Sequence, residues 1–412
     1  MKNIIIQNIF ISFFSKGILF LTFIFLSREL SVDKYSVYVY VSLILNFLPF
    51  FQLGSSHGIS ILLPKLSLSN AKEKKEIFLS YSIISICLQF IVFIIFFLKV
   101  KLDNYILLVI CVDFILSKLI ENSQIYLNSH LIFQKANNIK FFEQVFKPVF
   151  IFLFFYFYRS LESVFYSKLF TTIMLLFLVF NKEVFKYLKY SLTTISFSKL
   201  FLNGQLIYKT GFFVFISWAF DLLFRSSDLW IVKHFYSNYD FAQYGFTSSL
   251  AMNLWLFAMS YFAPYSNLLY SYVAKGEYDN VRNIVKTTNR KIFVIIAILI
   301  IFSLSFYPFL INFFVKKYED SYLLFGLMTI SAFALTMNNM YIYYLVSTGK
   351  FKEILKIQSL IVLLNFLLLL CCAKLNLSTK YVCCSTILSL SLYYFIVRNR
   401  YYYFINNLNV GI

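Results

Sequence analysis

Charged side chains are scarce in this sequence. Of its 412 residues only 13% are charged, whereas 60% are hydrophobic and 21% aromatic. Soluble domains carry about 25% charged residues, so the composition excludes an ordinary soluble protein. Long apolar runs separated by short polar loops predict instead an all-α, polytopic membrane protein.

The residue patterns of metal, disulfide and nucleic-acid sites are missing. There are three histidines, none in metal-ligand spacing, and six cysteines without a CxxC pair, so we expect free thiols and no metal. The net charge of +19 comes without a basic helix or an RNA-binding signature, which argues against a nucleic-acid partner. No cofactor fingerprint occurs, so we expect no cofactor.

Catalytic groupings are missing as well. The sequence shows no Ser-His-Asp set, no paired glycosidase carboxylates and no nucleotide fingerprint. The segment Ser347–Lys350 reads STGK but lacks the upstream glycine of a phosphate loop. Outward loops of about ten residues or fewer leave little chain for catalytic groups. We therefore expect a protein that is not an enzyme.

Windows of about 20 apolar residues predict the membrane spans. There are twelve of them: 8–27, 36–54, 77–98, 105–124, 142–158, 163–180, 210–232, 241–265, 292–314, 322–346, 356–373 and 378–397. The first span ends in Ser27-Arg28-Glu29 rather than in a small-residue cleavage site, so we expect it to be retained and not removed as a signal peptide.

Lys and Arg are unevenly distributed between alternate loops. The loops on the side of the N-terminus hold 22 of the 37, the opposite loops hold 10, and the remainder lie within spans. Because cytoplasmic loops are enriched in Lys and Arg, both termini are predicted to be cytoplasmic.

The longest interruption on the cytoplasmic side, 181–209, separates six spans from six. We therefore expect an N-terminal lobe at 1–195 and a C-terminal lobe at 196–412, as parallel repeats about an axis normal to the membrane. Sliding the sequence by 209 residues places Lys16 on Arg225 and so gives weak support to this repeat.

The seventh span carries three charges. At about 100° per residue, Asp221, Arg225 and Asp228 fall within an arc of roughly 60° of one helix. Each charge facing lipid would cost at least ~2.5 kcal/mol, so the stripe is expected to face protein or a water-filled cavity. It is either part of a transport pathway or a buried network that locks helix packing.

Other polar residues lie inside predicted spans. Lys16 is too deep in the first span to reach the interface, which favours a functional or paired lysine. In the fourth span Asp113 is the deeper acidic group and Lys118 flanks the same polar face, so both are candidates for a coupling network with Asp221 and Asp228. Asn253 is a candidate substrate-binding residue, although asparagine also commonly joins helices by hydrogen bonds.

Three windows resemble a known family. They are Arg28–Ser36 through Gln52-Leu53-Gly54, Asp228 through Tyr244-Gly245 with Ala263-Pro264 and 272–282, and Val346–Lys352 with Asn365. Together with the twelve spans, they resemble the polysaccharide flippases, which include exporters of O-antigen and other lipid-linked oligosaccharides, in the superfamily of multidrug, oligosaccharidyl-lipid and polysaccharide exporters. Ser36 stands where that family usually has glycine.

The resemblance implies two six-helix lobes around a central cavity that opens alternately to each side, a MATE-like fold. It also implies a bacterial inner-membrane location and an undecaprenyl-diphosphate-linked oligosaccharide as substrate, with membrane lipids and other polysaccharide assembly proteins as partners. Lys16 and Arg225 match by location the cations that line the cavity in related flippases. Lysine and arginine side chains in a cavity can bind the diphosphate of such a substrate.

Two other functions stay open at this point. A cation-coupled multidrug antiporter of the same fold would rely on Asp113, Asp221 and Asp228 rather than on the cations. A polysaccharide polymerase or membrane acyltransferase would also span the membrane many times, but the short outward loops argue against it.

Overall fold

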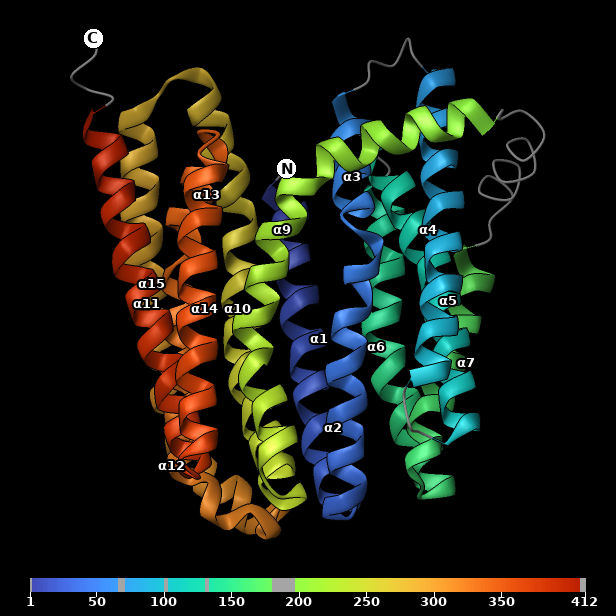
Figure 1. The fold of residues 1–412 in the computed structure, drawn as a ribbon, viewed down its shortest axis with the longest axis vertical. Helices are drawn as coiled ribbons and strands as arrows, with labels where there is room; N and C mark the ends of the chain where they lie inside the picture. The colour runs from blue at the N-terminus through green and yellow to red at the C-terminus, as the bar shows by residue number, and fades with distance from the viewer. Residues whose placement is uncertain (1, 66–70, 100–102, 130–132, 180–196, 408–412) are drawn as a thin grey trace. The chain divides into compact units, whose positions relative to one another are not determined.

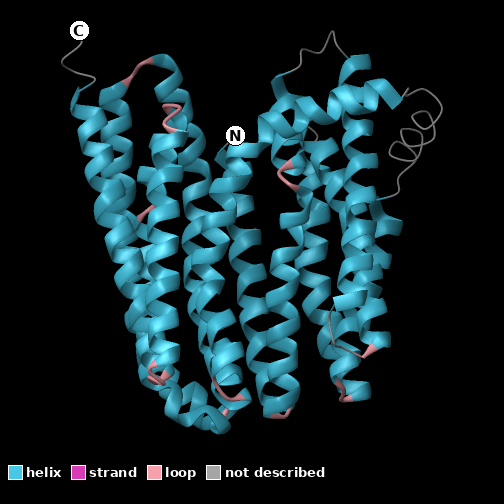
Figure 2. Cartoon of the chain, viewed as in Figure 1, coloured by secondary structure: helices cyan, strands magenta, loops and turns pink. Residues whose placement is uncertain are grey.

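The structure is a computed structural model that describes residues 2–65, 71–99, 103–129, 133–179 and 197–407. Within these ranges the chain is helical apart from short turns, and no strand occurs among them (Figure 2). The expectation of an all-α protein is therefore confirmed.

The described helices follow one another along the chain in the order seen in Figure 1. They are α1 (Lys2–Glu29), α2 (Val32–Phe47), the short 3₁₀ helix η1 (Leu48–Gln52), α3 (Ser55–Lys65), α4 (Ala71–Lys99), α5 (Asn104–Ser129), α6 (Phe133–Tyr158), α7 (Leu161–Val179), α9 (Phe197–Phe235), α10 (Asn238–Lys275), α11 (Tyr278–Phe314), the 3₁₀ helix η3 (Lys316–Ser321), α12 (Tyr322–Met337), α13 (Asn339–Ser347), α14 (Phe351–Lys374) and α15 (Thr379–Asn407).

Every predicted span coincides with one of these helices or with a consecutive pair. Six segments of the described chain are long and apolar enough to cross a membrane: Asn138–Tyr158, Phe197–Phe235, Tyr278–Phe314, Lys316–Ser347, Phe351–Lys374 and Thr379–Asn407. The helices are commonly longer than the apolar windows, because their ends continue into polar sequence. The chain is thus a polytopic membrane protein.

The second predicted span, 36–54, is not one continuous helix. It ends as α2 at Phe47, passes through η1 and reaches Leu53 and Gly54, which have φ angles of 48° and 85°. Pro49 lies in the first turn of η1, where its missing N–H does not break a helical hydrogen bond. The left-handed pair that follows lets the chain turn into α3.

By their internal contacts the residues form two compact units. Unit 1 comprises Met1–Leu43 and Phe220–Ile412, and unit 2 comprises Ile44–Ala219. The predicted lobes at 1–195 and 196–412, and the central cavity between them, stay predictions.

In unit 1, α10 is the central helix. It packs against α1, α11, α12 and α13, and α15 packs against α12 and α14. Two kinds of packing stabilise this unit: apolar side chains such as Val281, Val285 and Ile292 recur at helical spacing on the buried face of α11, and the rings of Tyr307 and Phe325 stack with centroids 4.0 Å apart. The start of α1 and the end of α15 lie at the same end of this unit (Figure 1).

The bounds of α10 follow from local chemistry. The Ser237 hydroxyl accepts a hydrogen bond from the Asp240 backbone N–H at 3.1 Å and donates one to the Asp240 carboxylate at 2.6 Å, which caps the first turn. Gly276 ends the helix with a φ of 73°, a left-handed conformation that glycine adopts without strain.

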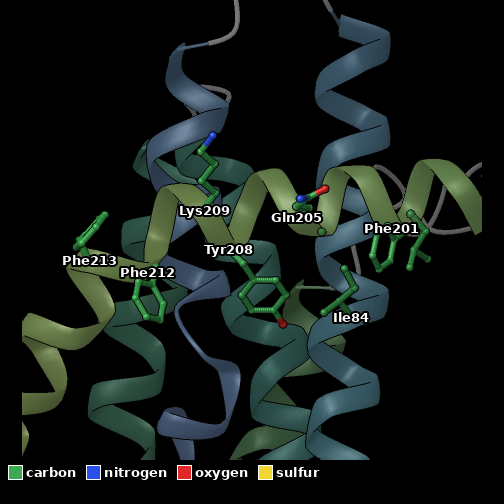
Figure 3. A pocket seen from close by; sticks show the side chains of 9 residues that line it. Ile84, Phe201, Gln205, Tyr208, Lys209, Phe212 and Phe213 are labelled. Carbon is green, nitrogen blue, oxygen red and sulfur yellow. The ribbon is translucent and has the colours of Figure 1, made fainter.

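In unit 2, α5 and α6 both pack against α7, and α4 packs against α3 and α5. The first part of α9 lies across the ends of α3 and α4 before the helix turns (Figures 1 and 3). Its approach to α3 is close because glycines meet there. A Cβ added at Gly58 would lie 2.0 Å from the carbonyl oxygen of Ile207, and one at Gly211 would lie 2.2 Å from that of Gly54.

Candidate functional site

Arg225 lies on the second half of α9, in unit 1, and is held in one orientation by two neighbours. Its Nη2 pairs with Oδ2 of Asp221 at 2.9 Å, one helical turn earlier, and its Nε donates to the Asp221 backbone carbonyl at 3.3 Å. The guanidinium carbon lies 4.7 Å from the ring centre of Trp255 on α10. The Arg225 side chain is still 23% exposed and that of Asp221 is 35% exposed.

Asp228 lies on the same helix as Arg225 but has different partners. Its Oδ2 accepts a hydrogen bond from the Tyr244 hydroxyl at 2.7 Å, and its Oδ1 accepts one from the backbone N–H of Leu229 at 2.8 Å. Asp228 is buried, and Tyr244 on α10 is fully buried. The three charges of the seventh span therefore divide into an ion pair and a separately bonded carboxylate.

Arg225 and Asp228 both line a small cavity in unit 1. It has a volume of about 20 Å³, and Ser248, Ser331, Cys383 and Thr386 are among its other lining residues. That is room for about one water molecule. In this conformation the cavity is too small for a diphosphate, so a ligand of Arg225 would have to approach the exposed side of the guanidinium.

Asn253 is buried on α10. Its side-chain amide donates to the Ser249 carbonyl at 2.9 Å, while its Oδ1 has no hydrogen-bond partner among the described residues. A second buried asparagine, Asn365 on α14, donates to the Ser227 hydroxyl of α9 at 3.0 Å. This polar contact joins α14 to α9.

Lys16 falls within α1, but its side chain lies outside the described residues. Its predicted role beside Arg225 stays a prediction.

The two remaining predicted site residues lie on α5, in unit 2. Asp113 accepts a hydrogen bond from the Thr172 hydroxyl of α7 at 2.5 Å. Lys118 is almost fully buried, with a side-chain exposure of 1%, and donates to Oε1 of Gln52 at 2.7 Å. Its Nζ also lies 2.9 Å from a carboxylate oxygen of Glu121, whose side chain is 45% exposed.

Sequence patterns did not identify the partners that orient these charges. Tyr244, Trp255 and Gln52 lie on other elements, and nothing in their local sequence marks them as neighbours of an ionised group. Glu121, which was not among the predicted site residues, pairs with buried Lys118.

A larger cavity of about 710 Å³ lies in unit 2 between α4 and the first part of α9 (Figure 3). Its walls are mainly apolar and include Ile84, Phe201 and Phe212. Tyr208 and Lys209 also line it and point to opposite sides of α9 in Figure 3. This lining is suited to a hydrocarbon chain rather than to an anion.

Among the described residues there is no cluster of His, Cys, Asp and Glu able to hold a metal ion.

No protein-family model matches the chain, and no curated protein matches its sequence. Solved structures do match it. A multidrug resistance MATE family transporter of the MOP superfamily, in an inward-facing conformation, is similar with a TM-score of 0.75 and 11% identity over 96% of this chain and 95% of that chain. The chain has a MATE-like fold.

Two further solved structures with a similar fold belong to transporters that are described in different terms. The lipid II flippase MurJ, in an inward closed conformation, matches with a TM-score of 0.67 and 13% identity over 96% of this chain and 87% of its own. A MOP superfamily transporter from Pyrococcus furiosus, described as having a binding pocket of reverse polarity that suggests a different function, matches with a TM-score of 0.68 and 10% identity over 98% and 96%. The MATE-like fold is thus shared by multidrug transporters and a lipid flippase.

Proposed function

We propose that this protein is a flippase that moves an undecaprenyl-diphosphate-linked oligosaccharide from the cytoplasmic to the outer leaflet of a bacterial inner membrane, with both of its termini in the cytoplasm. The MATE-like fold is compatible with a lipid-linked substrate as well as with a drug, so the fold alone does not choose between them. An arginine that is already oriented in the candidate site supports the lipid-linked substrate, because a diphosphate requires cations whereas a cationic drug requires carboxylates.

The observation that carries this proposal is the orientation of Arg225. Asp221 contacts its Nε and Nη2, and the Trp255 ring lies against the guanidinium. No contact is described for Nη1, and the side chain is 23% exposed. A guanidinium that is already oriented loses little side-chain entropy when it binds phosphate oxygens. In a site of reduced dielectric its attraction for a diphosphate exceeds that in bulk water.

The other candidate residues have assigned roles in this proposal. Lys16 supplies a second cation for the diphosphate, and Asn253 offers its unpaired Oδ1 to a substrate hydroxyl or amide. Asp221 competes with the substrate for Arg225, so release of the phosphate is assisted when the ion pair forms again. Asp113, Lys118 and Asp228 form the charge network that couples transport to an ion or to the membrane potential.

A second candidate function is a cation-coupled multidrug antiporter. The specific observation in its favour is Asp228, a buried carboxylate that has hydrogen bonds from Tyr244 and Leu229 but no salt bridge among the described residues. Such a carboxylate can take up a proton or a cation. Under this alternative, loss of the gene would increase drug sensitivity and leave surface polysaccharide unchanged.

Deletion of the gene tests the flippase proposal. The lipid-linked repeat should accumulate on the cytoplasmic leaflet, where it is inaccessible to a membrane-impermeant glycosidase or lectin in intact spheroplasts, and surface glycan should be lost. Expression of the wild-type gene should restore both. Normal amounts of lipid-linked repeat on the outer leaflet of the deletion strain would contradict the proposal.

A further inference from the structure

Unit 2 contains a second polar cavity, to which the function proposed above assigns no ligand. It has a volume of about 290 Å³ and lies among α4, α5 and α6. Its lining residues are Gln89, Phe114, Ser117, Lys118, Ile120, Glu121, Gln124 and Glu143. This volume is close to the lower end of the ~300–1,000 Å³ range of small-molecule sites.

Two glutamines at this cavity have unused hydrogen-bonding groups. Gln89 is only 2% exposed, and neither its amide nitrogen nor its carbonyl oxygen has a partner among the described residues. The amide nitrogen of Gln124 is likewise buried without a partner. A buried, unpaired amide costs about 1–3 kcal/mol, so these groups are expected to bind something that enters the cavity.

The charges of the cavity limit what that ligand can be. Lys118 is already bound to Gln52 and Glu121, so the positive charge of its ammonium group is neutralised and does not require an anionic ligand. Glu121 and Glu143 add two carboxylates to the lining, which disfavours an anionic ligand. A small metal cation is disfavoured too, because it would have to sit next to a buried ammonium group.

What remains is a neutral molecule that presents several hydroxyl groups. Side-chain amides donate to and accept from vicinal hydroxyls, and carboxylates accept from them. The ring of Phe114 offers an apolar surface for the C–H face of a sugar. We propose that this cavity binds one neutral or N-acetylated hexose ring, with Gln89 and Gln124 as its main hydrogen-bonding residues. This inference rests on the proposed function, because it assigns the cavity to part of the glycan of the transported lipid.

The cavity is also placed where a substrate loaded from the cytoplasm would meet it. In the predicted orientation α5 runs toward the cytoplasm, and Lys118, Glu121 and Gln124 lie in its second half. Glu121 is the exposed member of the buried ion pair, and its carboxylate therefore marks the accessible side of the cavity.

Direct binding tests the inference without any transport assay. The purified protein in nanodiscs is titrated with methyl glucoside, methyl galactoside, methyl N-acetylglucosaminide and methyl glucuronide, and saturation-transfer NMR records which ring protons contact it. At least one neutral glycoside should bind with millimolar affinity, and the glucuronide should bind more weakly. Binding of the glucuronide alone, or of none of the four, would overturn the assignment.

Gln89→Leu and Gln124→Leu locate the binding. Leucine preserves much of the volume and removes an unpaired amide, so both variants should fold with unchanged or higher thermal stability. Each should weaken binding of the glycoside about tenfold or more. Gln243→Leu is the matched control, because Gln243 is also a buried glutamine with an unpaired amide nitrogen but lies on α10 in unit 1. Wild-type affinity in the Gln89 and Gln124 variants would assign the cavity to water alone.

A transport assay separates the two proposals. If wild-type protein moves a lipid-diphosphate-linked sugar and Gln89→Leu does so equally well, the sugar site fails while the flippase proposal stands. If wild-type protein binds neutral glycosides and moves no lipid-linked sugar, the flippase proposal fails while the sugar site stands.

Discussion

The hydroxyl of Tyr244 donates a 2.7 Å hydrogen bond to the carboxylate of Asp228, and both side chains are buried. This bond joins α9 to α10. Asp228 forms no salt bridge with Arg225 among the described residues, although the two are one turn apart on the same helix and line the same small cavity. Arg225 is paired with Asp221 instead.

Replacing Tyr244 with phenylalanine should destabilise the protein. The Asp228 carboxylate would lose one of its two hydrogen bonds in a buried position, at a cost of about 1–3 kcal/mol. The thermal unfolding midpoint of purified protein measures this. In a double-mutant cycle with Asp228→Ala the two effects should be non-additive, because each variant removes the same bond. Additive effects would mean that the bond does not form.

The ion pair of Lys118 and Glu121 should respond unequally to removal of its two partners. Glu121→Gln leaves a buried ammonium group with only Gln52, whereas Lys118→Met leaves a carboxylate that is 45% exposed and can be hydrated. Glu121→Gln is therefore expected to cost more stability, by at least about 1 kcal/mol. Comparing the unfolding midpoints of both variants decides this, and the opposite order would show that Lys118 is not buried as charged ammonium.

The close approach of α3 and α9 predicts that Gly58 tolerates no side chain. Gly58→Ala would bring a methyl group against the backbone carbonyl of Ile207, and overpacking of this kind costs about 1–3 kcal/mol or more. Gly326→Ala is the control, since a Cβ there would meet only Leu304 at 3.7 Å and alanine favours the helix by up to ~1 kcal/mol. Equal yields of folded protein from the two variants would contradict the close approach of α3 and α9.

The predicted orientation can be tested by thiol labelling. In a background without the six natural cysteines, Leu375→Cys lies in the turn between α14 and α15, and Lys352→Cys lies at the start of α14. A membrane-impermeant maleimide should label Leu375→Cys in intact cells and Lys352→Cys only after permeabilisation. The reverse pattern would place both termini outside the cytoplasm.

Most of the helical plan was predictable because apolar runs of about 20 residues report directly on membrane crossing. The break after Phe47 was not, because it depends on Leu53 taking up a left-handed conformation, which its side chain does not favour. The full length of α9 was not predicted either, since its first part contains polar residues such as Lys199 and Asn203 and lies across the ends of α3 and α4 (Figure 1).

Only the arrangement of site residues within a single helix was predictable from the sequence. Periodicity placed Asp221, Arg225 and Asp228 on one face, but it does not report which member another helix will bind. Tyr244 lies 16 residues after Asp228, and Gln52 lies 66 residues before Lys118. Packing between helices determines which residues become such partners, and local sequence patterns do not predict that packing.

The most direct test of this account measures flipping by purified protein in proteoliposomes. The substrate is an undecaprenyl-diphosphate-linked sugar, and the protein is wild type, Arg225→Gln, Arg225→Lys or the exposed control Lys380→Gln. We expect transport by the wild type and by Lys380→Gln, and partial transport by Arg225→Lys. Arg225→Gln should lower transport about tenfold or more, because it removes a charge-assisted contact to phosphate. Transport at the wild-type rate by a correctly folded Arg225→Gln variant would contradict it.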